Sequence, residues 1–328
     1  MHFLPFVIAS LGPAVLLALG AVWGGLWAGA GLFAITVAVF FADKWEVALA
    51  PSDTSGDVLS VLIALTHFAL LIIAVIALTG PMETAAKIAL FVGLSLWFGQ
   101  VSSSNAHELI HRPQRGLHRL GVAVYTTLLY GHHASAHPLV HHVHAATDAD
   151  PNSAPKGMGF WRYVLRAWVG AFRAGWRAER KRYRGLAHPY VAYGVGAVLT
   201  LLGAALLGGF AGVLILVGLA LYAQVQLLLS DYVQHYGLRR RILSTGKPEP
   251  VGPAHSWNAP HWASAAMMLN APRHSDHHMR PGRHYPALEL TEEMPMLPQS
   301  LPVMAVIALI PPLWRRIMDR RAAAWSEA

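Results

Sequence analysis

Histidines recur in this chain at spacings that suit metal binding. Three short segments carry two or three histidines each, and a fourth carries one. In a helix, residues four apart lie on one face with their Cβ atoms about 5–6 Å apart, close enough for two imidazoles to bind one ion. The candidate ligands are His107 and His111, His137, His141 and His142, His235, and His274, His277 and His278. The segments are read as helical, so His137 and His141 are expected to act as one pair, like His107 and His111.

The size of this set indicates two metal ions. Nine neutral ligands exceed the roughly four to six donors that one first-row metal ion takes. Imidazole suits iron, zinc, copper and nickel, so the ligand type does not choose the metal. Without a metal, buried imidazoles would each need other partners for their ring nitrogens. Isolated histidines such as His67 and His118 are expected to be ordinary hydrogen-bonded residues.

Two other kinds of site fit part of the pattern. The segment from His107 through Glu108 to His111 matches the His-Glu-x-x-His motif of zinc proteases, whose glutamate is a general base. That short motif leaves the other histidine segments unexplained. A haem held by two histidines favours single histidines in the middle of facing spans, whereas these occur in groups at the ends of spans.

The composition is that of a membrane protein. The chain is 55% hydrophobic and 13% charged, against roughly 25% charged in soluble proteins. Apolar runs approach the ~20 residues that cross a bilayer. We expect one all-helical membrane domain over residues 1–328, with six transmembrane helices near 3–19, 22–41, 59–78, 85–101, 190–207 and 210–229. The first run lacks a basic start and leads directly into the second, so we expect it to be retained rather than cleaved.

The distribution of charge predicts the orientation of these spans. Most of the 25 Lys and Arg residues lie in the polar segments 105–188 and 231–328. Because Lys and Arg concentrate on the cytoplasmic side of bacterial membrane proteins, both segments are expected to form a cytoplasmic cap. The prediction is a multi-pass protein of a bacterial-type inner membrane, with both termini and the histidine site inside. The net charge of +8 follows from this and gives no reason to expect nucleic acid as a partner.

The chain has no cysteine. Disulfides, iron–sulfur clusters, thiolate zinc sites and a built-in rubredoxin are therefore excluded. Any redox chemistry must use histidine, carboxylate or a bound organic cofactor.

Several motifs together carry a resemblance to a known family. They are His107-Glu-Leu-Ile-His111, Tyr130-Gly-His132 with His137 to His142 and Ala146 to Pro151, Tyr232 to Leu238, His255-Ser-Trp-Asn258 and Arg273 to His278. With them the chain resembles the membrane-bound alkane monooxygenases, within the histidine-box group of desaturases, hydroxylases and xylene monooxygenases. The segment from Tyr232 to Leu238 points to the alkane branch.

The resemblance implies a function and its partners. In that family the nine box histidines bind two iron ions, and no separate protein nucleophile is expected. One oxygen atom of O₂ enters a terminal C–H bond of an alkane or a similar hydrophobic substrate, and the other becomes water. A rubredoxin or ferredoxin with its reductase supplies the electrons.

Three alternatives stay open. Two are enzymes, a membrane fatty-acyl desaturase or hydroxylase and a xylene-type monooxygenase of alkyl-aromatic substrates. A membrane metal-binding or transport protein, the third, would need polar residues within the spans, which contain almost none.

The chain departs from the family pattern beside its histidines. Ala136 and Gln234 stand where the family usually has Glu, and Pro272 where it usually has Gln. Carboxylates beside ligating histidines fix their tautomer and raise their basicity. The remaining candidates for that supporting contact, each also readable as a loop charge or helix cap, are Glu108, Asp148, Asp150, Asp231 and Asp276.

Overall fold

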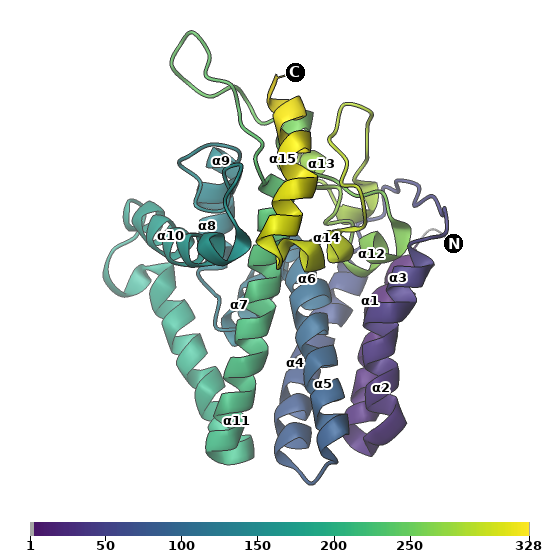
Figure 1. Ribbon diagram of the computed structural model, residues 1–328. Coiled ribbons are helices and arrows are strands. Elements are labelled where there is room, and N and C mark those ends of the chain that lie inside the picture. Colours follow the sequence, from purple (N-terminus) through teal and green to yellow (C-terminus); the bar gives the residue numbers. More distant parts are fainter. Residues whose placement is uncertain (1–2, 328) are drawn as a thin grey trace.

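Long apolar helices stand below a cap of short helices and loops in the computed structural model (Figure 1). The structure describes residues 3–327, and the elements it defines in that range are helical. Within residues 3–327, five helices are long and apolar enough to cross a bilayer. The chain is thus a membrane protein built from helices.

The first four predicted spans form two antiparallel pairs. The first pair turns at Gly24, whose φ of 63° suits glycine. The second helix of this first pair contains a π-helical turn, η1. A loop then leads to the second pair of helices. The elements are α1 (Leu4–Trp23), α2 (Gly25–Phe33), η1 (Ala34–Ala38), α3 (Val39–Ala42), α4 (Asp57–Thr79) and α5 (Thr84–Trp97).

The helix that begins with α5 continues beyond its apolar part into the first histidine segment. It passes through a second π-helical turn, η2 (Phe98–Ser102), into α6 (Ser103–Ile110). His111 follows as the C-terminal cap. The spacing of His107 and His111 is therefore helical, as predicted, and a rigid element that starts among the spans positions both.

The fifth and sixth predicted spans occupy one element, α11 (Pro189–His235). Non-helical backbone at Gly208 and Gly209 breaks it, with φ of 61° at Gly209. The two arms fold back on each other at the end opposite the cap (Figure 1). The predicted boundary between 190–207 and 210–229 falls at this break. Counted as two arms, α11 brings the five long apolar helices to the six predicted crossings.

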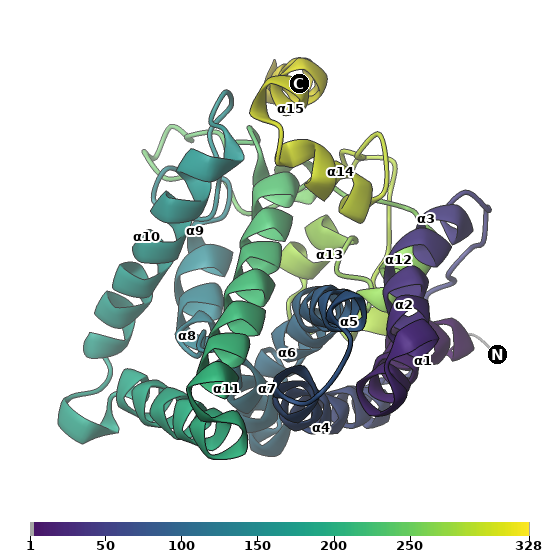
Figure 2. The same cartoon turned by 60° about the horizontal axis from the view of Figure 1, so that its bottom comes forward.

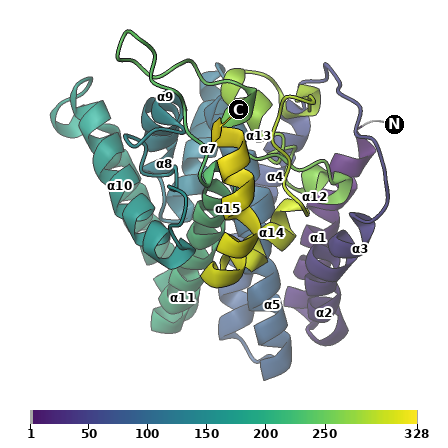
Figure 3. The same ribbon diagram turned by 45° about the horizontal axis from the view of Figure 1, so that its top comes forward.

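The cap is made of elements between and after these long helices. Figures 1 and 3 place α10 at one edge of the cap and α12 toward the other. The apolar segment 301–314 divides between α14 and the start of α15. The elements are α7 (Arg115–Thr127), α8 (His133–Ala136), η3 (His137–His141), α9 (His142–His144), α10 (Phe160–Arg180), η4 (Gly185–Ala187), η5 (Pro253–His255), α12 (Trp262–Met267), α13 (His274–Met279), η6 (Tyr285–Ala287), α14 (Leu301–Ala308) and α15 (Pro311–Glu327).

The hairpin of α11 depends on close packing at one glycine. A Cβ atom at Gly212 would collide with the backbone carbonyl oxygen of Ala204 in the other arm. We expect Gly212→Ala to lower the melting temperature of the detergent-solubilised protein by several degrees, because overpacking costs about 1–3 kcal/mol. Gly203→Ala is the matched control, since a Cβ there meets no atom within 4 Å. Equal melting temperatures for the two variants would contradict the proposed packing.

Candidate metal centre

Five imidazoles form a first group at the junction of α6, η3, α9 and α13. Their ligand atoms all lie within 4.8 Å of one another. The Nε2 atom of His137 is 2.6 Å from that of His107 and 2.9 Å from that of His142. The Nε2 atoms of His142 and His277 are 3.1 Å apart. The members are His107, His111, His137, His142 and His277.

Four buried imidazoles form a second group beside the first. The Nε2 atom of His274 is 3.0 Å from that of His235 and 3.1 Å from that of His278. His141 completes this group. The two groups are in contact, because the rings of His142 and His278 stack with centroids 4.5 Å apart. All nine predicted ligands therefore lie in two adjacent groups.

The predicted pairing of His137 with His141 is wrong. Residues 137–141 form a π-helical turn rather than an α-helical one. A π-helix closes its turn one residue later, so residues five apart face each other. His137 consequently meets His142 in the first group, whereas His141 turns to the second. The extra residue in this turn lets one short segment serve both groups.

The donor set fits two metal ions. Two nitrogens at right angles about one ion, at the ~2.1 Å typical of metal–imidazole bonds, lie about 3 Å apart, close to the spacings found here. Several ring nitrogens are also buried with no protein partner within the described residues. They include Nε2 of His111 and Nε2 of His141.

The electrostatics of the cap favour neutral imidazoles, the form that binds metal. Burial, and then the neighbouring rings, lower the pKa of His111 to about 4. The same causes hold the pKa values of His137, His142, His274, His277 and His278 well below the usual value.

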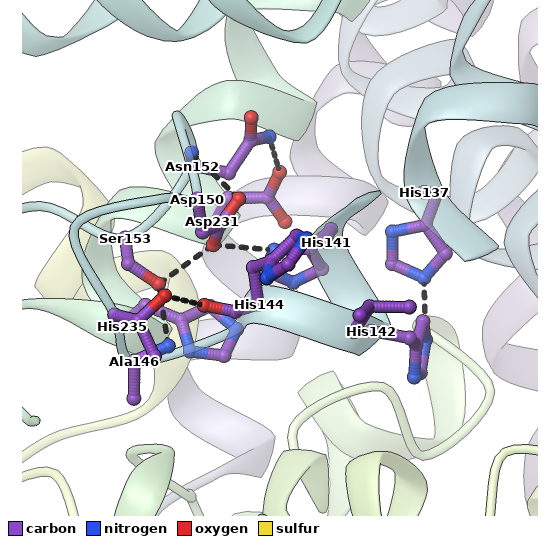
Figure 4. A network of polar contacts seen from close by, with 12 residues as sticks. His137, His141, His142, His144, Ala146, Asp150, Asn152, Ser153, Asp231 and His235 are labelled. Carbon is purple, nitrogen blue, oxygen red and sulfur yellow. Dashed lines mark hydrogen bonds and ion pairs between the residues drawn. The ribbon is translucent and has the colours of Figure 1, made fainter. Parts of the chain in front are cut away.

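His141 differs from the other cap histidines because a buried carboxylate supports it. Its Nδ1–H donates to Asp150 Oδ2 over 2.8 Å, and Ser153 Oγ donates to the same oxygen over 2.6 Å (Figure 4). Burial lowers the pKa of His141, but Asp150 and, to a smaller extent, Asp231 outweigh this effect and the net shift is upward. With Nδ1 fixed as a donor, the Nε2 lone pair of His141 is directed at the second group.

The other four candidate carboxylates have different partners. Asp231 accepts from Asn152 Nδ2 over 2.7 Å, and Asp276 is buried between Arg280 and Arg283. Asp148 is exposed and pairs with Arg239. Among the described residues, Asp150 alone of the five hydrogen-bonds one of the nine imidazoles.

Glu108 does not face the metal groups as a protease base would. Its Oε1 accepts from the backbone N–H of Tyr285 over 2.8 Å, and it pairs with Arg112. It thus ties α6 to the segment after α13. This placement argues against the zinc protease reading of the first motif.

Two of the departures from the family pattern have structural explanations. A Cβ atom on Gly175 would lie 3.0 Å from the Cβ of Ala136, so α10 packs closely against α8 at Ala136. The Gln234 amide accepts from Ser230 Oγ and donates to the Ala271 carbonyl. Gln234 therefore links α11 to the segment that leads into α13.

An asparagine outside the ligand set fixes the N-terminal end of α13. Asn258 Oδ1 accepts from the backbone N–H of Ser275 over 2.9 Å, and its Nδ2 donates to Ser275 Oγ over 2.8 Å. These bonds explain Asn258 in the His-Ser-Trp-Asn motif. They hold the helix that supplies three of the nine imidazoles.

A cavity of about 700 Å³ borders both metal groups. His107 and His137 of the first group and His274 of the second line it. Its other walls come from η1–α3, α5–α6, α11 and α14, which stand around one central region in Figure 2. An elongated molecule in this cavity can reach the histidines from among the long helices.

His133 lines the same cavity but was not among the predicted site residues. Its ring centroid is 5.0 Å from that of His137 and 4.9 Å from that of Tyr125. The sequence contained a signal for His133, because it precedes His137 by four residues, the same spacing that selected the other histidine pairs.

Comparison with known proteins agrees with this arrangement. A model of the fatty acid desaturase family matches residues 84–308, more than half of the chain. Alkane 1-monooxygenase 2 of Alcanivorax borkumensis is 32% identical over 74% of this chain and 65% of its own length. Alkane 1-monooxygenase 2 of Pseudomonas aeruginosa is 32% identical over 69% of this chain and 62% of its own length. Alkane 1-monooxygenase 1 of Alcanivorax borkumensis is 31% identical over 84% of this chain and 70% of its own length.

The chain spans less than two thirds of the length of the first two of these relatives. The match to the family nevertheless runs from α5 to α14 and includes all nine imidazoles of the two groups. The chain belongs to the fatty acid desaturase family.

Proposed function

We propose that this protein is a non-haem di-iron monooxygenase that inserts one oxygen atom of O₂ into a terminal C–H bond of an alkane or a similar hydrophobic molecule. The observation that carries the proposal is the meeting of two imidazole groups with one cavity. The similarity to alkane 1-monooxygenases supports this reaction over desaturation.

In this proposal the two imidazole groups hold one iron ion each. The bound metals would supply O₂ activation, while the substrate C–H bond, two electrons and two protons are converted with O₂ into an alcohol and water. The chain itself holds the ligands in place, excludes bulk water and aims the substrate carbon. Asp150 maintains the His141 tautomer, and the cavity walls align an apolar chain toward His107 and His274.

The electrons would come from a separate rubredoxin or ferredoxin with its reductase. The chain has no cysteine for an iron–sulfur centre of its own. Exposed basic residues of the cap, such as Arg241, offer a surface for an acidic carrier, since complementary charge speeds encounter.

We also propose that the cap and its histidines face the cytoplasm of a bacterial-type inner membrane. The turn at Gly24 and the break at Gly209 lie at the end opposite the cap (Figure 1). Lys and Arg are concentrated in the cap segments 105–188 and 231–328 instead, in agreement with the positive-inside rule.

The reaction is tested with purified protein in detergent, octane, O₂ and a reduced rubredoxin system. We expect about two irons per chain and formation of 1-octanol. If the protein contains iron but forms an alkene, the assigned reaction would be desaturation instead of hydroxylation. Two zinc ions with peptidase activity would overturn the proposal.

The ligand assignment predicts the effect of His274→Ala. This change removes the nitrogen shared by the close contacts of the second group, so we expect lower iron content and an activity loss of more than about a hundredfold. His118→Ala is the matched control, because the His118 ring hydrogen-bonds the Ile110 carbonyl and belongs to neither imidazole group. Full iron content in the His274 variant would refute its role as a ligand.

The supporting role of Asp150 predicts a smaller effect. Asp150→Asn leaves the side-chain shape but removes the charge that orients His141, so metal affinity should fall by about 10–100-fold. Competition with a chelator measures this affinity independently of turnover. Asp148→Asn, at an exposed carboxylate, should bind metal like the unmodified protein. Equal affinities in the two variants would contradict the orienting role.

A further inference from the structure

The cavity beside the metal groups has walls of two kinds. The walls from η1–α3 and α14 are mostly apolar, with Ile35, Phe40, Leu301 and Val306 as examples, although Thr36, Asp43 and Ser300 also line them. The walls from α11 and from α5–α6 instead carry a series of polar side chains. A cavity shaped only for a hydrocarbon would have no need of a polar wall, because each polar group there loses contact with water.

The polar wall follows helical spacing. On α11, the lining residues Tyr222, Gln226, Ser230 and Gln234 are four apart, so they form one stripe along the helix. The facing wall carries Gln100 and the serines of α6 ahead of His107. The two stripes meet at a pair of glutamines, Gln100 and Gln226.

The hydrogen bonding of this glutamine pair is incomplete. Gln100 Nε2 donates to Gln226 Oε1 over a long 3.4 Å. Gln100 Oε1 is buried without a partner, whereas the amide nitrogen of Gln226, on a partly buried side chain, donates no hydrogen bond to another described residue. Unmade hydrogen bonds in an apolar surrounding cost free energy. A pair that served only to hold two helices together in lipid would be expected to satisfy these atoms.

The approach of the two helices places this pair at the cavity wall. A Cβ atom on Gly99 would lie 2.6 Å from the Cβ of Gln226, so only glycine at 99 allows this approach. Gln100 precedes His107 by seven residues, which corresponds to about 10 Å along the helix axis. The pair therefore lies deeper among the long helices than the metal groups.

We propose that this cavity binds an elongated apolar molecule that carries a hydroxyl group, held by Gln100 and Gln226 while its far end lies at the histidines. A hydroxyl both donates and accepts, so it can serve a free amide oxygen and a free amide N–H together. An alkane does neither, and an ether only accepts. The carbon nearest the histidines is then about 10 Å from the anchored oxygen. Oxygenation of that carbon rests on the proposed function, whereas the binding preference does not.

Three probes of equal heavy-atom number test the preference, namely 1-decanol, undecane and 1-methoxynonane. Equilibrium binding is measured for the full-length protein in nanodiscs of one lipid composition, after subtraction of partition into empty nanodiscs. We expect 1-decanol to bind about tenfold more tightly than the other two, because it gains two neutral hydrogen bonds.

Changing the glutamine pair should abolish the difference. In the double variant Gln100→Leu with Gln226→Leu, 1-decanol should lose its advantage while undecane binds at least as well as before. Gln114→Leu is the matched control, at an exposed position before α7 that does not line the cavity. Equal binding of 1-decanol and 1-methoxynonane to the unmodified protein would overturn the proposal without any variant.

Turnover separates this inference from the proposed function. If undecane is oxygenated but 1-decanol has no binding advantage, the function stands and the hydroxyl site is refuted. If 1-decanol binds preferentially and neither probe is oxygenated with iron, O₂ and reduced rubredoxin, the hydroxyl site stands and the function is refuted. With both correct, the product of 1-decanol is a diol.

Discussion

A buried imidazole nitrogen without a partner costs free energy, and this chain gathers nine imidazoles in one region of its cap. Much of the surrounding structure acts to bring them together. The helix begun by α5 runs on to Ile110, and α11 extends as far as His235. Asn258 fixes the start of α13, and Asp150 fixes the ring of His141. Each contact restricts where a ring can point, and metal ions would give partners to the Nε2 atoms that meet in the two groups.

The helical architecture could be predicted from the sequence because lipid imposes simple requirements on it. Apolar length marks the spans, and the Gly208–Gly209 pair falls between two predicted spans where α11 breaks. The nine histidines could also be selected, since their spacing is local. Their division into groups of five and four could not, because it depends on the π-helical turn at 137–141. Such a turn forms under tertiary packing and has no reliable local signature.

Contacts between segments far apart in the sequence could not be predicted from local sequence patterns either. Five carboxylates were possible supports for the histidines, and only the fold distinguishes Asp150, against His141, from the exposed Asp148. Gln100 and Gln226 read as two isolated polar residues in apolar spans, yet the fold places them side by side across 126 positions of sequence. Likewise, α14 is an apolar helix too short to cross a membrane, and only the fold shows that it forms a wall of the cavity.

The two metal groups are built as one unit. α6 supplies ligands to the first group alone and α11 to the second alone, but the other two segments serve both. His141 and His142, adjacent in sequence, belong to different groups, as do His277 and His278. A movement of α13 or of the turn at 137–141 therefore displaces ligands of both groups at once. In the proposed two-ion site, ordering these segments around one ion would prepare most of the second site, so part of the conformational entropy needed for the second ion would already be lost. The cavity, which touches both groups, is bounded by the same shared segments and depends on the same ordering.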